Sequence, residues 1–464
     1  MRRLTGTHVY SYVKCPRLAA LDLHLPRSER RPPHAWEEFA ARRGRDFEAE
    51  LVASLGAVAP EYPERDFEAG AAATLQLLRD GAPLVHQAVL QDGDRLGLPD
   101  LLRKLPGESR LGAHHYEVID VKTSGRARSD QVLQVAFYSD LLTAVQGRAP
   151  THGALVLKDG HEERFALADY EAALRDVLAD LRRLRERPDD AGAFVQAACA
   201  SCHWDHRCLP ELQQRSDLSL VHGMSQGARA ILERLGCRTV EDLATFHPDG
   251  ARARGNLEAA LVRRLRRGAQ ARLLGEPLVE ARPRAPLGPA AIVHLLADPF
   301  ADRVLAFGVL HPAVEDGAFT WARAEAAADE GRVFGELVAA LPRSVRLLHF
   351  GEALPRWYAE HAFAREADPA LEARFVDLGK RLRTAAIQPA PVFGLADLVR
   401  TALRRDPLRA GHAGEAAMWV AEPDAAARLA AKLRADLQDL AALMARVLDA
   451  APSAAGEAVD GATA

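Results

Sequence analysis

The spacing of apolar and polar residues predicts a mixed α/β fold in the first half of the chain. Helical periodicity dominates to about residue 78. Short apolar runs typical of strands occupy residues 85–90, 95–103, 115–122 and 153–157. A helical pattern over residues 130–145 separates the last two runs, and residues 169–186 predict a further helix. Because strands that alternate with helices form a sheet covered by helices, we expect an α/β domain over residues 1–215.

The next region, residues 216–275, has a helical pattern throughout. Ser225 and Thr239 precede helical runs and can cap a helix N-terminus, and Gly236 is placed to end a helix. The last predicted helix of the region carries five arginines, Arg263, Arg264, Arg266, Arg267 and Arg272. These side chains suit contact with phosphates, or they simply face solvent, and both interpretations stay open.

The rest of the chain divides into a linker, a second domain and a tail. Residues 276–288 are rich in proline, which is typical of a linker. Residues 285–450 predict two strands followed by helices, and therefore a second α/β domain. The segment 451–464, rich in alanine, glycine and serine, predicts a disordered tail.

Composition limits the classes of protein that are possible. The chain has 464 residues, 48% of them hydrophobic, which is enough for two or three domains with full cores. The net charge of −4 excludes a general basic field, so any contact with nucleic acid must be local. No apolar run reaches the roughly 20 residues that span a bilayer, and the first residues lack the apolar core of a signal peptide. We expect a cytoplasmic protein without a membrane segment.

Two carboxylates and a lysine surround two of the predicted strands. Asp100 follows Gly97-Leu-Pro, and Asp120 and Lys122 stand two residues apart in the next run. Alternation along a strand places Asp120 and Lys122 on one face, and a hairpin can set Asp100 beside them. Paired carboxylates bind Mg²⁺ or Mn²⁺, and an adjacent lysine can polarise a water or steady a phosphate. The pattern therefore favours phosphodiester hydrolysis.

Lysine is rare in this arginine-rich chain, which strengthens the case for Lys122. Arginine keeps its proton, so it cannot replace a lysine that must present a compact ammonium or shift its pKa. The alternative is a strand that ends in solvated charges, which is the usual meaning of an Asp-x-Lys sequence on its own.

Together with Gln134-x-x-x-Tyr138 on the next predicted helix, this pattern resembles the PD-(D/E)xK nuclease superfamily in its RecB-like branch. The whole layout is most similar to the RecB-like nuclease family of the Thermotoga type. The resemblance implies a restriction-endonuclease-like core in which Asp100, Asp120 and the Val121 carbonyl bind Mg²⁺ or Mn²⁺. The same resemblance implies that Lys122 activates the water, and that Gln134 and Tyr138 support the site or contact DNA.

The family also has an upstream acidic residue on a helix. Gly44-Arg-Asp-Phe-Glu48 matches that position, so the resemblance implies that Glu48 binds or orients the metal. The alternative is a solvated glutamate, because the predicted helix over residues 36–55 is rich in charge.

Four of the five cysteines form a pattern: Cys15, Cys199, Cys202 and Cys208. A long chain without a signal peptide favours metal or cluster ligation over disulfides, and four thiolates suit an iron–sulfur cluster. The resemblance to AddB-like iron–sulfur nucleases implies a [4Fe–4S] cluster that ties the N-terminal segment to the end of the domain. Zinc is the rival, since Cys₄ is also a zinc set and His203 and His206 lie among the cysteines. We expect Cys237 to be a small core residue.

The resemblance extends weakly to the second half. The turns of residues 216–275 resemble a helix-hairpin-helix unit, whose backbone amides hold DNA phosphates. The family places an RNase H-like domain at residues 285–450, which opens with Asp-x-Glu on its first strand. This chain has His294 and Leu296 there, Asp298 stands beside Pro299, and only Asp377 matches a later carboxylate. Because one carboxylate cannot hold two metals, we expect this domain to be degenerate.

These patterns and the resemblance lead to one main hypothesis and two others. The main hypothesis is a metal-dependent DNA nuclease that cuts single-stranded or frayed DNA in repair, recombination or other nucleic-acid processing. One alternative is a non-catalytic scaffold that binds nucleic acid together with a helicase or repair partner. The other alternative is a nuclease directed at RNA.

Overall fold

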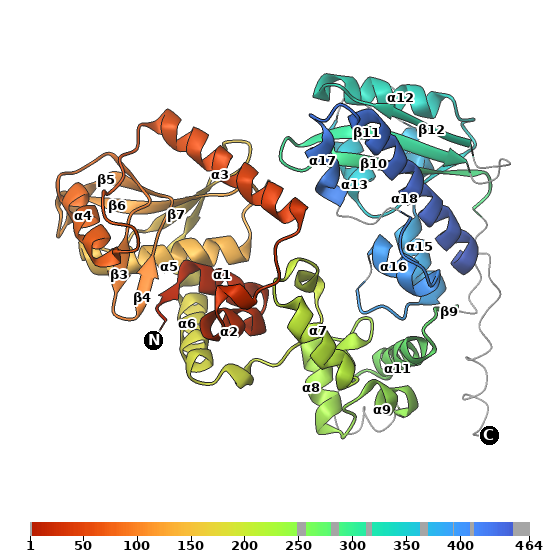
Figure 1. The fold of residues 1–464 in the computed structure, drawn as a ribbon, viewed down its shortest axis with the longest axis horizontal. Helices are drawn as coiled ribbons and strands as arrows, with labels where there is room; N and C mark the ends of the chain where they lie inside the picture. The colour runs from red at the N-terminus through yellow and green to blue at the C-terminus, as the bar shows by residue number, and fades with distance from the viewer. Residues whose placement is uncertain are drawn as a thin grey trace. The chain divides into compact units, whose positions relative to one another are not determined.

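The computed structural model describes residues 2–247, 257–279, 287–311, 318–361, 370–392, 394–408 and 413–448. The chain forms two compact units, the first from Met1–Ala193 with Ala198–His206 and the second from Phe194–Ala197 with Arg207–Ala464. Both units combine helices and strands (Figure 1), so the expected α/β class is confirmed. The predicted tail, residues 451–464, and most of the linker, residues 280–286, lie outside the described residues.

The first unit is built on a five-stranded sheet of order β2-β5-β6-β7-β8. Its strands are β2 Leu84–His86, β5 Leu101–Ser109, β6 Gly112–Val121, β7 His152–Val156 and β8 Glu162–Ala166. Its helices are α1 Gly6–Lys14, α2 Pro16–His24, α3 Ala35–Leu55, α4 Phe67–Arg79, α5 Ser129–Gln146 and α6 Glu171–Glu186. Neighbouring strands run antiparallel except β6 and β7, which are parallel because α5 crosses between them.

Helices cover both faces of this sheet (Figure 1). On one face, α5 contributes Phe137 and Leu141 to the main core, and α1 and α6 pack around it. On the other face, Phe47 and Leu51 of α3 pack on Ile119 and other apolar residues of the sheet. The carboxyl end of β6 is therefore enclosed between α3 and α5, and it is here that the predicted acidic residues lie.

Two predicted strands are wrong in extent, because each is broken in the structure. Residues 85–90 divide into β2 and β3 Leu90–Asp92, and residues 95–103 divide into β4 Arg95–Gly97 and β5. The first break follows from Gln87, whose φ of 50° is left-handed. The second contains Pro99, which has no N–H to donate and restricts the residue before it. At each break the chain passes between the main sheet and a small sheet of order β1-β4-β3, where β1 is Leu4–Thr5.

The second unit contains the predicted helices of residues 216–275 as α8 Gln226–Arg234, α9 Val240–Thr245 and α11 Ala259–Leu274. They are preceded by α7 Asp205–Gln214, which the sequence pattern did not predict. Ser225 caps α8 by accepting the Ala228 N–H, and Thr239 caps α9 by accepting the Asp242 N–H. Gly236 follows the end of α8 with a φ of 88°, the left-handed conformation that glycine favours there. The predicted caps of this region are thus confirmed.

The second unit also contains a five-stranded sheet of order β12-β11-β10-β13-β14. Its strands are β10 Ala290–Asp298, β11 Arg303–His311, β12 Ala318–Arg323, β13 Arg346–His349 and β14 Phe375–Asp377. β11 pairs antiparallel with both β10 and β12, whereas β13 pairs parallel with β10 and β14 pairs parallel with β13. The prediction of two strands followed by helices is wrong, because β12 follows β11 and two further strands come later. β13 and β14, at four and three residues, are too short to give a periodic pattern.

Helices pack on both faces of this second sheet (Figure 1). Its helices are α12 Glu330–Ala339, α13 Ala353–Glu360, α15 Leu378–Ala385, α16 Leu395–Ala402, α17 Ala416–Trp419 and α18 Ala425–Leu448. Phe334 of α12 and Trp357 of α13 pack with Phe307 on one face. Leu437 of α18 and neighbouring helices pack on the other face. A two-residue ladder of β9 Leu278–Val279 with β15 Ala386–Ile387 completes the unit.

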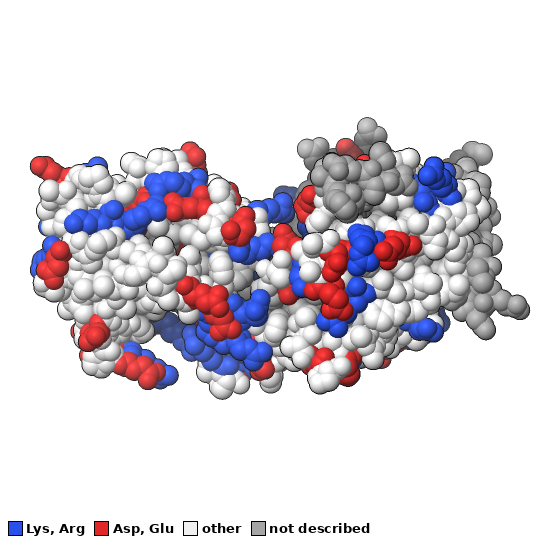
Figure 2. All heavy atoms as spheres, turned by 90° about the horizontal axis from the view of Figure 1, so that it is seen from above, with Lys and Arg blue, Asp and Glu red and all other residues white. Residues whose placement is uncertain are grey.

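The described residues include no helix that is both long and apolar enough to cross a membrane. Acidic and basic side chains are interspersed on the face shown in Figure 2, in keeping with the net charge of −4.

Candidate active site

Asp100 and Asp120 meet where β5 begins and β6 ends. The β5–β6 hairpin pairs Leu101 with Ile119, which brings the residues on either side of this pair together. The Asp100 N–H donates to Asp120 Oδ1 at 3.4 Å, and the Val121 N–H donates to Asp100 Oδ2 at 2.7 Å. The predicted hairpin geometry is confirmed, and the Pro99 break is what lets Asp100 turn in toward the strand end.

Lys122 points to the same side as Asp120, as strand alternation predicts. Lys122 Nζ lies 2.5 Å from Asp120 Oδ2. The exposed fraction of the Asp120 side chain is only 2%, whereas that of Lys122 is 21%. The Lys122 N–H donates to the Val156 carbonyl at 2.8 Å, which holds the residue in line with the parallel strand β7. The pair is therefore buried at its acidic end and open to solvent at its ammonium.

Burial and mutual repulsion shape the electrostatics of this group. Burial first, and then the charge of Asp120, raise the pKa of Asp100 well above its usual value. Burial acts to lower the pKa of Lys122, but the charges of Asp120 and Asp100 outweigh it and the pKa is raised. Lys122 is thus an ammonium at neutral pH, and one lysine faces two carboxylates. The site favours a further positive charge, which a divalent cation supplies.

Glu48 reaches the same region from α3. Its Oε1 lies 3.2 Å from His86 Nε2 and accepts a hydrogen bond from Gln87 Nε2 at 3.0 Å. The Gln87 N–H in turn donates to the Asp100 carbonyl, and the charge of Glu48 contributes to the raised pKa of Asp100. One turn earlier on α3, Gly44 lies close to Thr123, the residue after Lys122. The structure therefore brings Glu48 to the site, where it is held by two residues of the β2 end.

Gln134 and Tyr138 lie one turn apart on α5, and Tyr138 is buried. Gln134 Nε2 donates to the Tyr138 hydroxyl at 3.0 Å. Burial first, and then the charges of Asp120 and Asp100, raise the pKa of Tyr138, so its phenol keeps its proton. Tyr138 is therefore a neutral group within the field of Asp100 and Asp120.

Three neighbours of the site were missed by the sequence patterns. Tyr10 on α1 is near enough to contribute to the raised pKa of Lys122, and its ring lies 4.1 Å from Lys14 Nζ. His86 and Gln87 hold Glu48, as described above. The only sequence signal for His86 and Gln87 is their place at the end of a predicted strand, and Tyr10 has no signal because its helix is distant along the chain.

The carboxylates fit a hard divalent cation. Asp120 Oδ2 is a buried oxygen that receives no hydrogen bond of normal geometry, although Lys122 forms an ion pair with it. No three His, Cys, Asp or Glu side chains of the described residues are grouped as ready-made metal ligands. Mg²⁺ needs no such group, because it is usually bound by one or two carboxylates and keeps several waters. Asp100 and Asp120, with Glu48 and the Val121 carbonyl, are the oxygen donors available to it.

The N-terminal helices bring part of the cysteine pattern into one region of the first unit. Cys15 separates α1 from α2, and Asp22 of α2 lies 2.8 Å from His203 Nε2 and accepts the Trp204 Nε1–H at 2.9 Å. The Trp204 N–H donates to Cys202 Sγ at 3.4 Å. The segment with Cys202 therefore packs on the helix that follows Cys15, and His203 is bound to a carboxylate.

The remaining cysteines lie on separate elements. Cys199 lies in the single helical turn Ala197–Ser201, and Cys208 is buried on α7. The cofactor of the four-cysteine pattern stays a prediction. Cys237 is 2% exposed, and burial raises the pKa of its thiol to about 12, so its predicted place in the core is confirmed.

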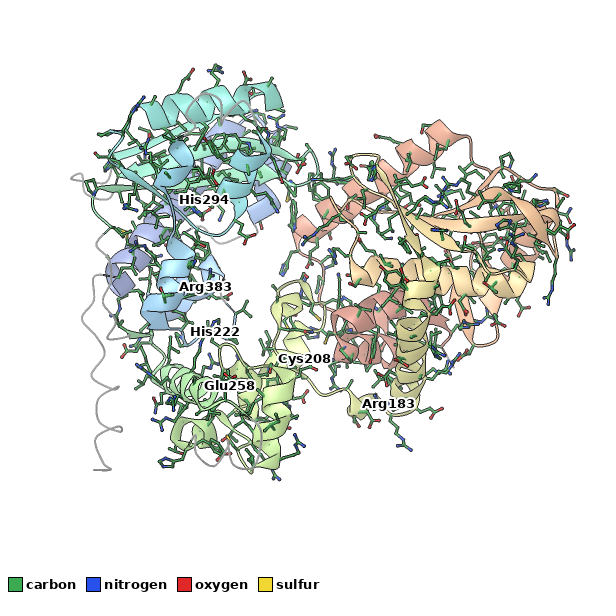
Figure 3. The ribbon with its side chains drawn as sticks, turned by 180° about the vertical axis from the view of Figure 1, so that it is seen from behind. Arg183, Cys208, His222, Glu258, His294 and Arg383 are labelled. Carbon is green, nitrogen blue, oxygen red and sulfur yellow. The ribbon has the colours of Figure 1, made fainter. Side chains whose placement is uncertain are left out.

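The candidate residues of the second unit serve its packing. His294 on β10 (Figure 3) lies 3.4 Å from Asp436 Oδ2, and Leu296 is buried in the core. Asp298 accepts two N–H groups of the following turn, as its place beside a proline predicts. Asp377 accepts the Lys380 N–H at 2.9 Å and caps α15. Each polar group here is committed to a structural contact.

The arginines of α11 do not form one exposed face. Arg263 and Arg264 are exposed, whereas Arg266, Arg267 and Arg272 are half-buried. Burial lowers the pKa of Arg272 below its usual value. The helix packs against α9, and contact of its arginines with phosphates stays a prediction beside the solvent-facing alternative.

No protein-family model and no curated protein matches this chain.

Proposed function

We propose that the chain is a metal-dependent nuclease that hydrolyses phosphodiesters of DNA. The observation that carries this proposal is the buried pair Asp100–Asp120 with Lys122 Nζ 2.5 Å from Asp120. Two carboxylates that meet where β5 begins and β6 ends, with a lysine beside them, are a donor set suited to metal-dependent phosphodiester hydrolysis. The excess negative charge of the site supports binding of Mg²⁺ or Mn²⁺ over a purely structural role.

Each residue of the site would have its own role in the proposed hydrolysis. Asp100 and Asp120, with Glu48 and the Val121 carbonyl, would hold the ion, which supplies charge neutralisation at the phosphate and a more acidic water. Lys122 is protonated, so it donates to the phosphate or the water rather than accepting a proton. Tyr138, neutral and buried, keeps the carboxylates in place from α5.

The finer architecture supports the same proposal. In the first unit, antiparallel β2, β5 and β6 followed by α5 and parallel β7 support a restriction-endonuclease-like core. In the second unit, the order β12-β11-β10-β13-β14 supports an RNase H-like domain. Because His294 and Leu296 stand at its metal positions and serve packing, we propose that this domain is degenerate.

We propose a [4Fe–4S] cluster on Cys15, Cys199, Cys202 and Cys208, with zinc as the alternative. The packing of the Cys202 segment on α2, through Asp22, supports the closeness of Cys15 and Cys202. The thiolates would hold the cluster, which would join the two ends of the domain. His203 faces Asp22 with its Nε2, so only its Nδ1 could bind zinc.

The test is cleavage of end-labelled single- and double-stranded DNA and RNA by the anaerobically purified chain with Mg²⁺ or Mn²⁺. The variant Asp120→Asn should abolish cutting. The matched control is Asp436→Asn, since Asp436 is also a buried aspartate with a lysine partner, Lys432 Nζ at 2.9 Å. Unchanged cleavage by Asp120→Asn contradicts the proposal. If the parent chain binds nucleic acid without cutting it, the non-catalytic scaffold is favoured. If it cuts RNA alone, the RNA-directed nuclease is favoured.

A further inference from the structure

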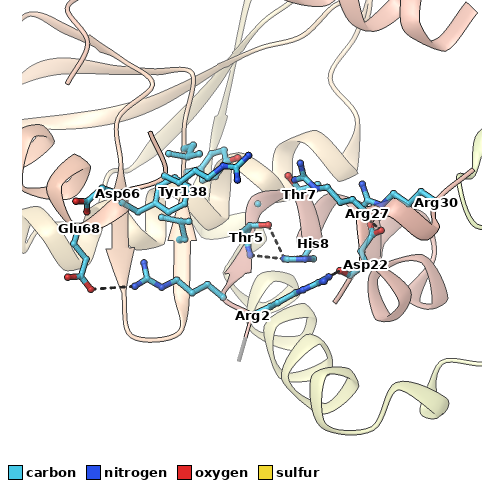
Figure 4. Close-up of a pocket in the computed structure, with 16 residues that line it drawn as sticks. Arg2, Thr5, Thr7, His8, Asp22, Arg27, Arg30, Asp66, Glu68 and Tyr138 are labelled. Atoms are coloured by element: carbon cyan, nitrogen blue, oxygen red, sulfur yellow. Dashed lines mark hydrogen bonds and ion pairs between the residues drawn. The ribbon is translucent and has the colours of Figure 1, made fainter. Parts of the chain in front are cut away.

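A cavity of about 970 Å³ opens beside Tyr138 in the first unit (Figure 4). Its inner wall includes Gly6, Leu98 and Tyr138, so it begins two residues from Asp100 along the chain. Its other walls come from the chain start, from α2 and from the segment before α4. The cavity therefore shares Tyr138 with the candidate active site.

Arginines give this cavity an excess of positive charge. Five line it, at positions 2, 3, 27, 30 and 65, against three carboxylates, at positions 22, 66 and 68. The Arg2 guanidinium donates to the backbone carbonyls of Asp22 and Leu25, so these bonds leave its charge uncompensated. Arg27 is exposed and has no acidic partner among the described residues. The cavity suits a polyanion.

The other polar groups of the cavity do not cancel this charge. His8 is neutral at physiological pH, because burial lowers its pKa to about 4. The Asp66 carboxylate caps α4 by accepting the Ala69 N–H at 3.0 Å. Asp22 is paired with Arg30, and only Glu68, 3.9 Å from Arg3, reaches toward the opening. Arg65 lies 3.5 Å from Glu64, so Arg2 and Arg27 are the two cavity arginines without a carboxylate partner among the described residues.

A second cavity, of about 690 Å³, shares Arg27 and Arg30 with the first. It is lined further by Trp36 and by Pro32 and Pro33. Trp36 is half-buried at the start of α3, so part of its ring is accessible from this cavity. Cations beside an accessible aromatic ring are what a nucleic-acid strand requires, because its phosphates need charge and its bases need a stacking surface.

We propose that the two cavities form one track for a single strand of nucleic acid. Phosphates contact Arg2 and Arg27, a base stacks on Trp36, and the strand passes Tyr138 to the Asp100–Asp120 site. A duplex fits less well, because its bases are stacked within the helix and are not available to Trp36. The delivery to Asp100 and Asp120 rests on the proposed nuclease function, whereas the binding of the strand does not.

The test measures binding of a labelled oligonucleotide to the full chain in EDTA, where no cleavage occurs, by fluorescence anisotropy. Trp36→Ala should weaken binding of single-stranded DNA about tenfold, and Trp36→Phe should restore most of it, since stacking on any aromatic ring suffices. Arg27→Glu should weaken binding and reduce its salt dependence. The control Arg79→Glu changes an equally exposed arginine on α4 outside both cavities and should bind as the parent does.

The outcomes separate this proposal from the proposed function. Parent-like binding by both Arg27→Glu and Trp36→Ala, in chains that still cut DNA, overturns the track and leaves the nuclease intact. If both variants lose binding and the parent chain never cuts DNA, the strand track is supported and the nuclease function is contradicted. Equal affinity for duplex and single strand overturns the single-strand assignment. Should Trp36→Ala fail to fold, the surface variant Arg27→Glu and the rescue variant Trp36→Phe decide the question.

Discussion

Gly97 packs directly against the ring of Tyr138. A β-carbon at position 97 would lie 2.9 Å from Tyr138 Cδ1 and 2.7 Å from Leu141 Cδ1. The backbone of Gly97 is not in a left-handed conformation, so the glycine is required by space rather than by a turn. Gly97 begins the sequence pattern that contains Asp100, and Tyr138 ends it. The two ends of the pattern are therefore in contact. The contact fixes the break between β4 and β5 that turns Asp100 toward Asp120.

We predict that Gly97→Ala destabilises the chain by about 1–3 kcal/mol, because the added methyl group overpacks the contact with Tyr138 and Leu141. Cleavage should fall as well, since Asp100 follows three residues later. Denaturant unfolding and nuclease assays measure the two effects. The control Gly192→Ala adds its methyl group where no atom lies within 4 Å, and it should be neutral. Equal stability of both variants would show that the packing at Gly97 is loose.

Lys122 compensates a buried carboxylate, which predicts a dependence of stability on metal. Lys122→Met leaves Asp120 with no positive partner in a site where it is 1% exposed. We expect a loss of about 3 kcal/mol in metal-free protein, as for other broken buried pairs. Mg²⁺ should restore part of that loss, since the cation replaces the ammonium. Thermal unfolding with EDTA and with Mg²⁺ tests this, and an equal loss in both would argue against a cation at Asp120.

The raised pKa of Asp100 predicts a pH dependence in metal-free protein. The folded state binds a proton that the unfolded state releases, between the ordinary pKa of about 3.9 and the raised value. The resulting stabilisation is complete below pH about 3.9 and is lost as the pH rises through the folded pKa. Asp100→Asn removes this dependence, so it should be more stable than the parent at neutral pH but not near pH 4. Parallel stability curves for the two proteins would show that Asp100 is not buried against Asp120.

Strand alternation and hairpin pairing were enough to predict that Asp100, Asp120 and Lys122 meet. These are short-range rules, and all three residues lie on one hairpin or beside it. The same rules failed at Gln87 and Pro99, because a run of apolar residues does not reveal where a strand leaves one sheet for another. The residues around the breaks are apolar in both sheets, so the apolar pattern continues across positions where the strand is interrupted.

Residues that reach the site from distant elements could not be predicted from any local pattern. Tyr10 and Arg2 lie about a hundred residues before Asp120, and their position depends on how α1 packs on α5. Arg27 belongs to a short turn with no regular spacing. Glu48 is the exception, because the family resemblance implied it and the structure brings it near Asp100. Cavities form from such packing, so the proposed strand track was invisible in the sequence.

The four-cysteine proposal predicts colour and iron. Protein purified without oxygen should be brown, with broad visible absorbance and about four iron atoms per chain. Cys202→Ser should lose the colour and destabilise the first unit, because Cys202 lies beside the Trp204–Asp22 contact. Cys237→Ser, a buried cysteine outside the pattern, should keep the colour. Elemental analysis that finds one zinc and no iron would replace the cluster with a structural zinc site.

The second unit should contribute no hydrolysis. Two-metal chemistry of the RNase H type needs several carboxylates that converge on ions roughly 4 Å apart, and β10 offers His294 and Leu296 where two of these belong. The Asp377 carboxylate caps α15. Asp377→Ala should therefore lower the free energy of unfolding by about 1 kcal/mol and leave cleavage unchanged. The comparison is best made in the Asp120→Asn background, in which the first site is inactive. Metal-dependent cleavage that remains in Asp120→Asn and disappears on adding Asp377→Ala would show that the second unit is an active nuclease after all.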